Sequence, residues 1–249
     1  MARVAGVLLT LLPNDPQGGI DPGQVRAAVR PQDLHQPRTR LLALENTHNF
    51  CGGTVLSLER TDALAAAAHE SGLRTHLDGA RIFNAEIVTG VPVADLAAKM
   101  DTVCFCLSKG LSAPVGSLLC GSEAFMARAR RVRKMLGGAM RQAGVLAAAG
   151  LVALDTMVDR LRDDHANAQR LATGLEQQGL AVYAAAVETN IVMLAVPDAP
   201  SWARRLAAEG VLITVLGPRR ARMVTHADVT ASQIDIALER IATVRPVPA

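Results

Sequence analysis

One lysine stands out among the residues that could take part in chemistry. The chain has only three lysines, and Lys109 follows the short apolar run 102–107. Burial at the end of a strand disfavours the ammonium form of a lysine and makes its amine available as a nucleophile toward carbonyl groups. The spacing therefore predicts a reactive amine at Lys109. An ordinary strand-end lysine that reaches solvent is the competing interpretation.

A carboxylate follows a second apolar run in the same way. Asp78 ends the strand-like segment 73–77, with Gly79 next and Arg81 two residues further on. A lysine that binds pyridoxal phosphate (PLP) as a Schiff base needs a carboxylate beside the pyridinium nitrogen, because the protonated ring then withdraws electrons from the substrate. Lys109 and Asp78 together indicate a PLP site. The simpler alternative for Asp78 is a helix N-cap.

Composition narrows the class of protein. With 249 residues, half of them apolar, the chain can bury the core of one large domain or of two unequal ones. The net charge is +3, and the basic segment 128–134 has no interleaved aromatic residues, so we expect no nucleic-acid binding. Four cysteines without metal-ligand spacing predict a reduced, cytoplasmic protein with no metal site.

The apolar run 4–12 is too short to span a bilayer and lacks a signal-peptidase site, so we interpret it as a first buried strand rather than a membrane or targeting segment. Further strand-like runs alternate with helical periodicity, with Asp21 and Ser57 as helix caps and a short helix at 93–100. This pattern predicts an α/β fold with a mainly parallel sheet flanked by helices in residues 1–150. The other expected strands are 41–44, 73–77, 102–107 and 117–120.

A long helical pattern at 140–175 ends at Gly179 and leads into a second α/β region. Thr230 and Gln233 form a possible capping box for the last helix. We therefore predict a small C-terminal α/β domain over residues 151–249. Its expected strands are 181–185, 191–196, 211–215 and 222–225, and its expected helices are 202–208 and 232–244.

Several short strings resemble the low-specificity threonine aldolases, which are PLP enzymes of the aspartate-aminotransferase fold type. The strings are Leu44–Asn49, His76–Arg81, Leu107–Leu111, Pro114–Gly116 and Gly137–Gln142. The similarity runs from Val4 to the last helix. It also implies an N-terminal truncation, because the family's phosphate-binding loop and its ring-stacking histidine lie upstream of the point where this chain begins.

The resemblance implies roles for individual residues. Lys109 would bind PLP covalently and move protons at the substrate Cα, and Asp78 would pair with the ring nitrogen. Arg81 and Arg222 would grip the substrate carboxylate, since a planar guanidinium can hold a carboxylate through two hydrogen bonds; Arg81 also belongs to the cofactor site. Structural ion pairs are the competing interpretation for both arginines. His35 would lie near the substrate hydroxyl as a catalytic residue.

Families of this fold build each active site at a dimer interface, so the resemblance implies a homodimer or homotetramer. Lys134 and Arg141, which flank the glycines at 137 and 138, would then reach a partner's site. A plain connection between two helices explains these glycines nearly as well. His165 falls on the apolar stripe of the long helix, where we expect a hydrogen-bonded core histidine.

The implied activity is the retro-aldol cleavage of L-threonine or L-allo-threonine, a small β-hydroxy amino acid, to glycine and acetaldehyde in amino-acid metabolism. Two alternatives stay open from the sequence. One is an inactive truncated homologue that serves only as a structural or dimerisation partner. The other is a different PLP-dependent lyase or an aminotransferase.

Overall fold

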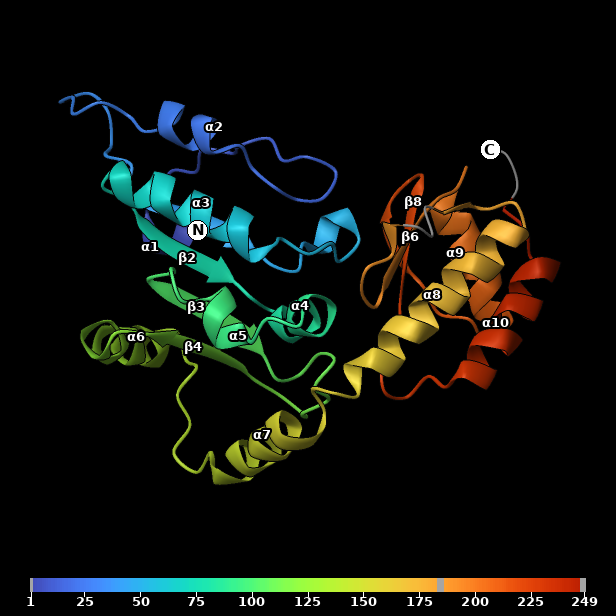
Figure 1. The fold of residues 1–249 in the computed structure, drawn as a ribbon. Helices are drawn as coiled ribbons and strands as arrows, with labels where there is room; N and C mark the ends of the chain where they lie inside the picture. Colours follow the sequence, from blue (N-terminus) through green and yellow to red (C-terminus); the bar gives the residue numbers. More distant parts are fainter. Residues whose placement is uncertain (1, 183–185, 247–249) are drawn as a thin grey trace.

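Two sheets organise the chain, one in each half (Figure 1). The computed structural model describes residues 2–182 and 186–246. In the first half, the parallel strands β1 (Leu41–Glu45), β2 (Arg74–Asp78) and β3 (Thr102–Cys106) are followed by the antiparallel β4 (Ser117–Gly121). Asp78 pairs with Glu45 on one side and with Cys104 on the other. The carboxyl ends of three strands therefore meet at one edge.

Helices cover this sheet, and the apolar core between helices and sheet includes Leu64 from a helix and Leu77 from β2. Asp21 and Ser57 accept backbone N–H groups of the first turns of their helices, as predicted. A helix that the sequence analysis did not identify begins directly after Arg81. The helices are α2 (Pro22–Ala27), α3 (Leu58–Glu70), α4 (Ile82–Thr89), α5 (Val93–Leu96), α6 (Glu123–Met135) and α7 (Gly144–Thr156).

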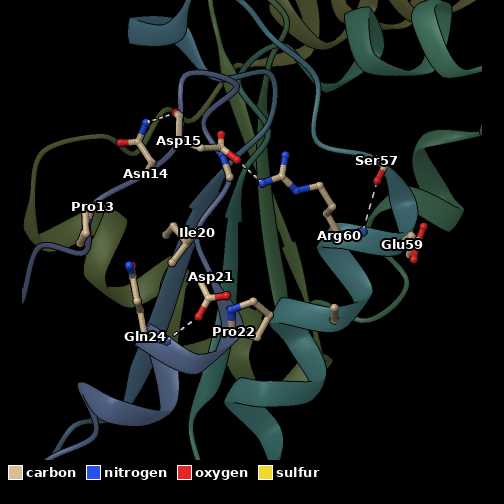
Figure 2. A pocket seen from close by; sticks show the side chains of 12 residues that line it. Pro13, Asn14, Asp15, Ile20, Asp21, Pro22, Gln24, Ser57, Glu59 and Arg60 are labelled. Atoms are coloured by element: carbon tan, nitrogen blue, oxygen red, sulfur yellow. Dashed lines mark hydrogen bonds and ion pairs between the residues drawn. The ribbon is translucent and has the colours of Figure 1, made fainter.

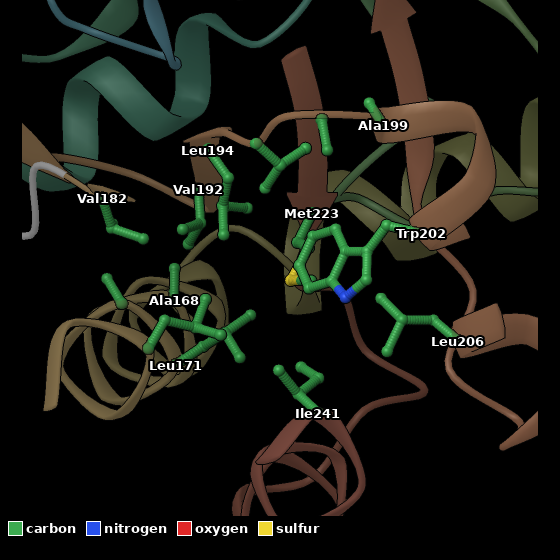
Figure 3. Packing of buried hydrophobic residues seen from close by; sticks show 14 of the residues in the cluster. Ala168, Leu171, Val182, Val192, Leu194, Ala199, Trp202, Leu206, Met223 and Ile241 are labelled. Carbon is green, nitrogen blue, oxygen red and sulfur yellow. The ribbon is translucent and has the colours of Figure 1, made fainter. Parts of the chain in front are cut away.

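The second half is built on an antiparallel sheet with the strand order β5-β6-β8-β7. Its strands are β5 (Ala181–Val182), β6 (Ile191–Ala195), β7 (Thr214–Gly217) and β8 (Arg220–Val224), and its helices are α8 (Leu161–Gln177), α9 (Ala199–Ala208) and α10 (Ala231–Thr243). Figure 3 shows Trp202 at the centre of the core that these elements share. Its indole N–H donates to the carbonyl of Val244 at 2.6 Å. The predicted capping box at Thr230 is confirmed.

The predicted strand at 4–12 is wrong. The chain forms a single helical turn, α1 (Ala2–Ala5), and then runs through residues 6–12 without regular structure. Leu8, Leu9 and Leu11 are exposed. The apolar run alone does not make a strand, because a strand needs a neighbouring backbone to satisfy its hydrogen bonds, and this segment forms no ladder with β1.

The helical pattern at 140–175 is divided between α7 and α8, with a break at 157–160. Ala153 of α7 packs beside Leu107 of the first half, whereas Leu171 of α8 packs in the second core. One straight helix could not pack on both of these cores, so the chain changes direction between α7 and α8. The predicted boundary after residue 150 falls inside α7 and stays a prediction.

Most other predicted elements are confirmed within one or two residues. The helix expected at 93–100 ends at Leu96. The strand expected at 211–215 begins at Thr214, because its pairing with β8 starts there, opposite Arg222; Val211 and Ile213 pack against the core without regular structure. The end of the expected strand 181–185 lies outside the described residues. Within the described ranges, no helix combines the length and apolarity needed to cross a membrane.

Candidate functional site

Asp78 and Lys109 lie at the carboxyl ends of neighbouring parallel strands. Asp78 is the last residue of β2, and Lys109 follows β3 by three residues. The Asp78 carboxylate is exposed and accepts the backbone N–H of Ala80 at 3.0 Å. The thiol of Cys104 donates to it at 3.7 Å. Burial and the charge of Asp78 raise the pKa of this thiol, which favours its neutral, donating form.

The burial expected for Lys109 is not observed. Its side chain is exposed and forms no hydrogen bond or ion pair with any residue that the structure describes. The reason is local, because β3 is only half-buried and the chain turns back toward solvent after Leu107. The amine is therefore open to solvent and accessible to a cofactor.

A single amide oxygen joins the two arginines that the resemblance singled out. Arg222, in the middle of β8, donates to Oδ1 of Asn49 at 2.7 Å. Arg81, just before α4, donates to the same atom at 3.3 Å. The two guanidinium groups come from different halves of the chain and converge at the edge where β2 ends.

The electrostatics around this pair favour an anion. Burial lowers the pKa of Arg81, and the nearby charge of Arg222 lowers it further. Nε of Arg222 is buried and has no hydrogen-bond partner among the described residues. Two positive groups that share one neutral acceptor, with a donor unused, form a site that a carboxylate would complete.

The segment 46–56, which carries Asn49, is fixed within the first half. The side chain of Asn46 is buried, donates to the carbonyl of Leu56 at 3.0 Å and accepts its N–H at 3.2 Å. The backbone N–H of Asn49 donates to Glu45 at 3.2 Å. Asn49 is thus held at the end of β1, beside the strand that ends in Asp78.

The second half fixes the same segment from the other side. The carboxylate of Glu188 accepts the N–H of Val55 at 2.8 Å, and the hydroxyl of Thr189 donates to the carbonyl of Gly53 at 2.8 Å. Sequence reasoning assigned no role to Asn49. Its only signal was its place at the end of the string Leu44–Asn49.

A cavity of about 860 Å³ opens beside Asp78. Glu45 and His48 line it together with Asp78, and the segment 6–12 forms much of its apolar wall. The ring nitrogen Nδ1 of His48 is buried and has no partner among the described residues. The cavity therefore offers apolar surface for a ring, with polar groups at one end.

A second cavity, of about 680 Å³, lies between α2 and α3 (Figure 2). Arg60 forms an ion pair with Asp15 across it, and Asp21 caps α2 there. None of the residues predicted for chemistry lines this cavity. We therefore place the candidate site at the strand ends, where Asp78 meets the larger cavity.

The remaining predicted residues lie apart from this cluster. His35 is in an exposed loop, and among the described residues only its backbone N–H is held, by the Asp33 carboxylate at 2.7 Å. Lys134, near the end of α6, and Arg141, in the connection to α7, are also exposed. Their catalytic and inter-subunit roles stay predictions.

Residues 1–199 match the model of a family described as beta-eliminating lyase. The chain belongs to this family. It is 43% identical over 246 residues to the probable low-specificity L-threonine aldolase 2 of Arabidopsis thaliana, and the match covers 96% of this chain and 69% of that relative. The resemblance inferred from the short strings is thereby confirmed.

Solved structures confirm the fold. The threonine aldolase of Leishmania major superposes with a TM-score of 0.71 at 19% identity, covering 92% of this chain and 69% of that one. A serine palmitoyltransferase variant from S. paucimobilis with a bound PLP-myriocin aldimine gives 0.66 at 20% identity, covering 90% and 58%. The fold of this lyase is therefore shared with enzymes of different activities.

Proposed function

We propose that this protein is a PLP-dependent lyase that cleaves L-threonine or L-allo-threonine to glycine and acetaldehyde. The observation that carries the proposal is the convergence of Arg81 and Arg222 on Asn49, at the strand ends that bear Asp78 and Lys109. A relative named as a threonine aldolase at 43% identity supports this choice over other reactions of the same fold.

The residues present fit PLP. Asp78 offers an open carboxylate beside the larger cavity, and Lys109, just beyond the neighbouring strand, offers an amine without a partner among the described residues. Asp78 would hold the proton on the pyridine nitrogen, and Lys109 would bind the cofactor carbonyl. PLP bound in this way would supply the sink for the electrons of the broken Cα–Cβ bond.

The protein groups orient the substrate and move its protons. Arg81 and Arg222 hold the α-carboxylate from two sides and so fix the direction of the Cα–Cβ bond. The β-hydroxyl must lose its proton as this bond breaks, which releases acetaldehyde, and Cα must gain a proton to become glycine. Lys109 would return the proton to Cα. His35 or a water molecule would accept the hydroxyl proton.

We also propose a homodimer or homotetramer in the cytoplasm. Apolar side chains of α6 and α7 are exposed, including Met135 and Val145 at 83% and 82%, and these support a subunit interface close to Lys134 and Arg141. The four cysteines are all unpaired, which supports a reducing compartment.

The first experiment is an absorbance titration with PLP, comparing the wild-type protein with Lys109→Ala. We expect a visible band that depends on Lys109 and shifts when glycine or threonine is added. Acetaldehyde release from threonine should then fall by more than about a thousandfold in Lys109→Ala, because the covalent attachment is lost. If the wild type shows no such band, the proposed enzyme activity is rejected, and the alternative of an inactive structural or dimerisation partner is favoured.

A panel of substrates distinguishes this reaction from the other PLP reactions. The proposal requires acetaldehyde and glycine from threonine, in equal amounts. Formation of a keto acid and ammonia, or amino-group transfer to a keto acid, would instead identify a β-eliminating lyase of another specificity or an aminotransferase.

A further inference from the structure

A half-buried histidine of the second half is linked to the backbone of Arg81. Nε2 of His165, on α8, lies 2.8 Å from Oδ1 of Asn84, on α4. Asn84 is 2% exposed, and its amide nitrogen donates to the carbonyl of Arg81 at 3.3 Å. Because the amide nitrogen faces Arg81, the amide oxygen faces His165, and the ring must donate. Two hydrogen bonds thus connect α8 to the first arginine.

The protonation of His165 makes this link directional. Burial lowers its pKa to about 4, and the charge of Arg162 acts in the same direction. The ring is therefore neutral near neutral pH and has a single N–H, which Asn84 receives. The proposed reaction gives this half-buried imidazole no task of its own.

The preceding residue of α8 is linked to the other arginine. The carbonyl of Asp164 accepts the hydroxyl of Thr225 at 2.6 Å, and Thr225 comes directly after β8, three residues beyond Arg222. The Asp164 side chain is fully buried and pairs with Arg160 at 2.6 Å, which fixes this turn of the helix. Two adjacent residues of α8 thus hold both arginine-bearing elements.

The loop that carries Lys109 packs on the same junction. A Cβ added at Gly110 would lie 2.6 Å from Cδ2 of Leu161 and 4.0 Å from polar atoms of Asn84 and Asp164. The start of α8 is therefore in contact with three elements of the candidate site at once.

We propose that Asp164 and His165 are positioning residues that set the spacing between Arg81 and Arg222, and with it the grip on a substrate carboxylate. Neither residue touches the substrate. Only the nature of that ligand, an amino-acid carboxylate, rests on the proposed function.

Hydrogen–deuterium exchange tests the link without any cofactor. His165→Leu removes the donor and keeps an apolar side chain, so the amides of residues 79–89 should exchange about tenfold faster, as expected for the loss of one buried hydrogen bond. His165→Gln retains an N–H donor and should restore slow exchange. Asn167→Ala is the matched control, because Asn167 lies on the same helix but donates to Val229 within the second half.

Steady-state kinetics test the consequence for the carboxylate. In His165→Leu, and in Thr225→Val for the Asp164 link, the KM for threonine should rise about tenfold while kcat changes less than about twofold, because only the grip on the carboxylate is loosened. His165→Gln should return KM to the wild-type value. The spectrum of the protein with PLP should be the same in all of these variants.

The proposal is overturned if exchange in 79–89 and KM are both unchanged in His165→Leu, or if Asn167→Ala has the same effects. If the wild-type protein binds no PLP, the proposed function fails, and the exchange contrast between His165→Leu, His165→Gln and Asn167→Ala still decides whether the link exists.

Discussion

Asn49 occupies the place between Arg81 and Arg222 that a carboxylate of the substrate is proposed to share. A neutral amide satisfies one donor from each guanidinium without cancelling their charge. This choice leaves two half-buried positive groups close together; burial lowers the pKa of Arg81, the charge of Arg222 lowers it further, and both effects cost stability. The arrangement is typical of a binding site that keeps its affinity for a ligand at a cost to the stability of the protein without that ligand.

Asn49→Asp should therefore weaken substrate binding and increase the stability of the protein. An aspartate would form ion pairs with both arginines and compete with the substrate carboxylate, so we expect the KM for threonine to rise about a hundredfold, while the midpoint of thermal unfolding increases. The measurement is a pair of assays, steady-state kinetics and thermal melting. Asn49→Ala is the control, and a lower melting midpoint in Asn49→Asp would contradict the argument.

At the scale of elements, Asp101 joins β2, β3 and the end of α3 on the side opposite the candidate site. Its carboxylate accepts the N–H of Thr75 at 2.9 Å, forms a hydrogen bond with the His69 ring at 3.0 Å and forms an ion pair with Arg74 at 2.7 Å. Burial raises the pKa of Asp101, but the hydrogen bonds from Thr75, His69 and Arg74 outweigh it and hold the pKa well below its usual value of 3.8.

The sign of the pH dependence follows from this shift. The unfolded chain binds a proton at Asp101 more readily than the folded one, so this contribution to the free energy of unfolding is complete above pH 3.8 and falls as the pH drops toward the lower folded value. We expect Asp101→Asn to lose about 1–3 kcal/mol at neutral pH, as is usual when a charged acceptor is removed. Urea unfolding at pH 7 and pH 3 measures both effects. If the free energy of unfolding falls by the same amount between these pH values in Asp101→Asn and in the wild type, the pH argument is contradicted.

For the whole molecule, the distribution of exposed apolar side chains predicts self-association. Leu151 and Val152 of α7 are 63% and 60% exposed, and Leu136 and Met140 before this helix are 63% and 60% exposed. Isolated apolar side chains are common on protein surfaces, but these four large ones, all exposed within residues 136–152, favour an interface. These residues follow α6 and lie on α7, in the same part of the sequence as Lys134 and Arg141, which are proposed to serve a partner's site.

Leu151→Glu should reduce the assembly, because it places a charge within the predicted interface. Sedimentation velocity should show a dimer or larger species for the wild type and a shift toward monomer for Leu151→Glu. Leu212→Glu, at a site 84% exposed in the second half, is the matched control and should not dissociate the assembly. A monomeric wild-type protein would reject this prediction.

The features that the sequence alone determined are local ones. Asp21, Ser57 and Thr230 cap their helices through contacts within three residues, and Asp78 and Lys109 follow apolar runs that form neighbouring strands. The predicted strand at 4–12 failed because strand pairing depends on a distant partner. Tertiary structure alone decided the bridge from Asn49 to Arg222, 173 residues away, and the link from His165 to Asn84, 81 residues away. Such contacts form only when two separate cores dock, and no local pattern of residues encodes how they meet.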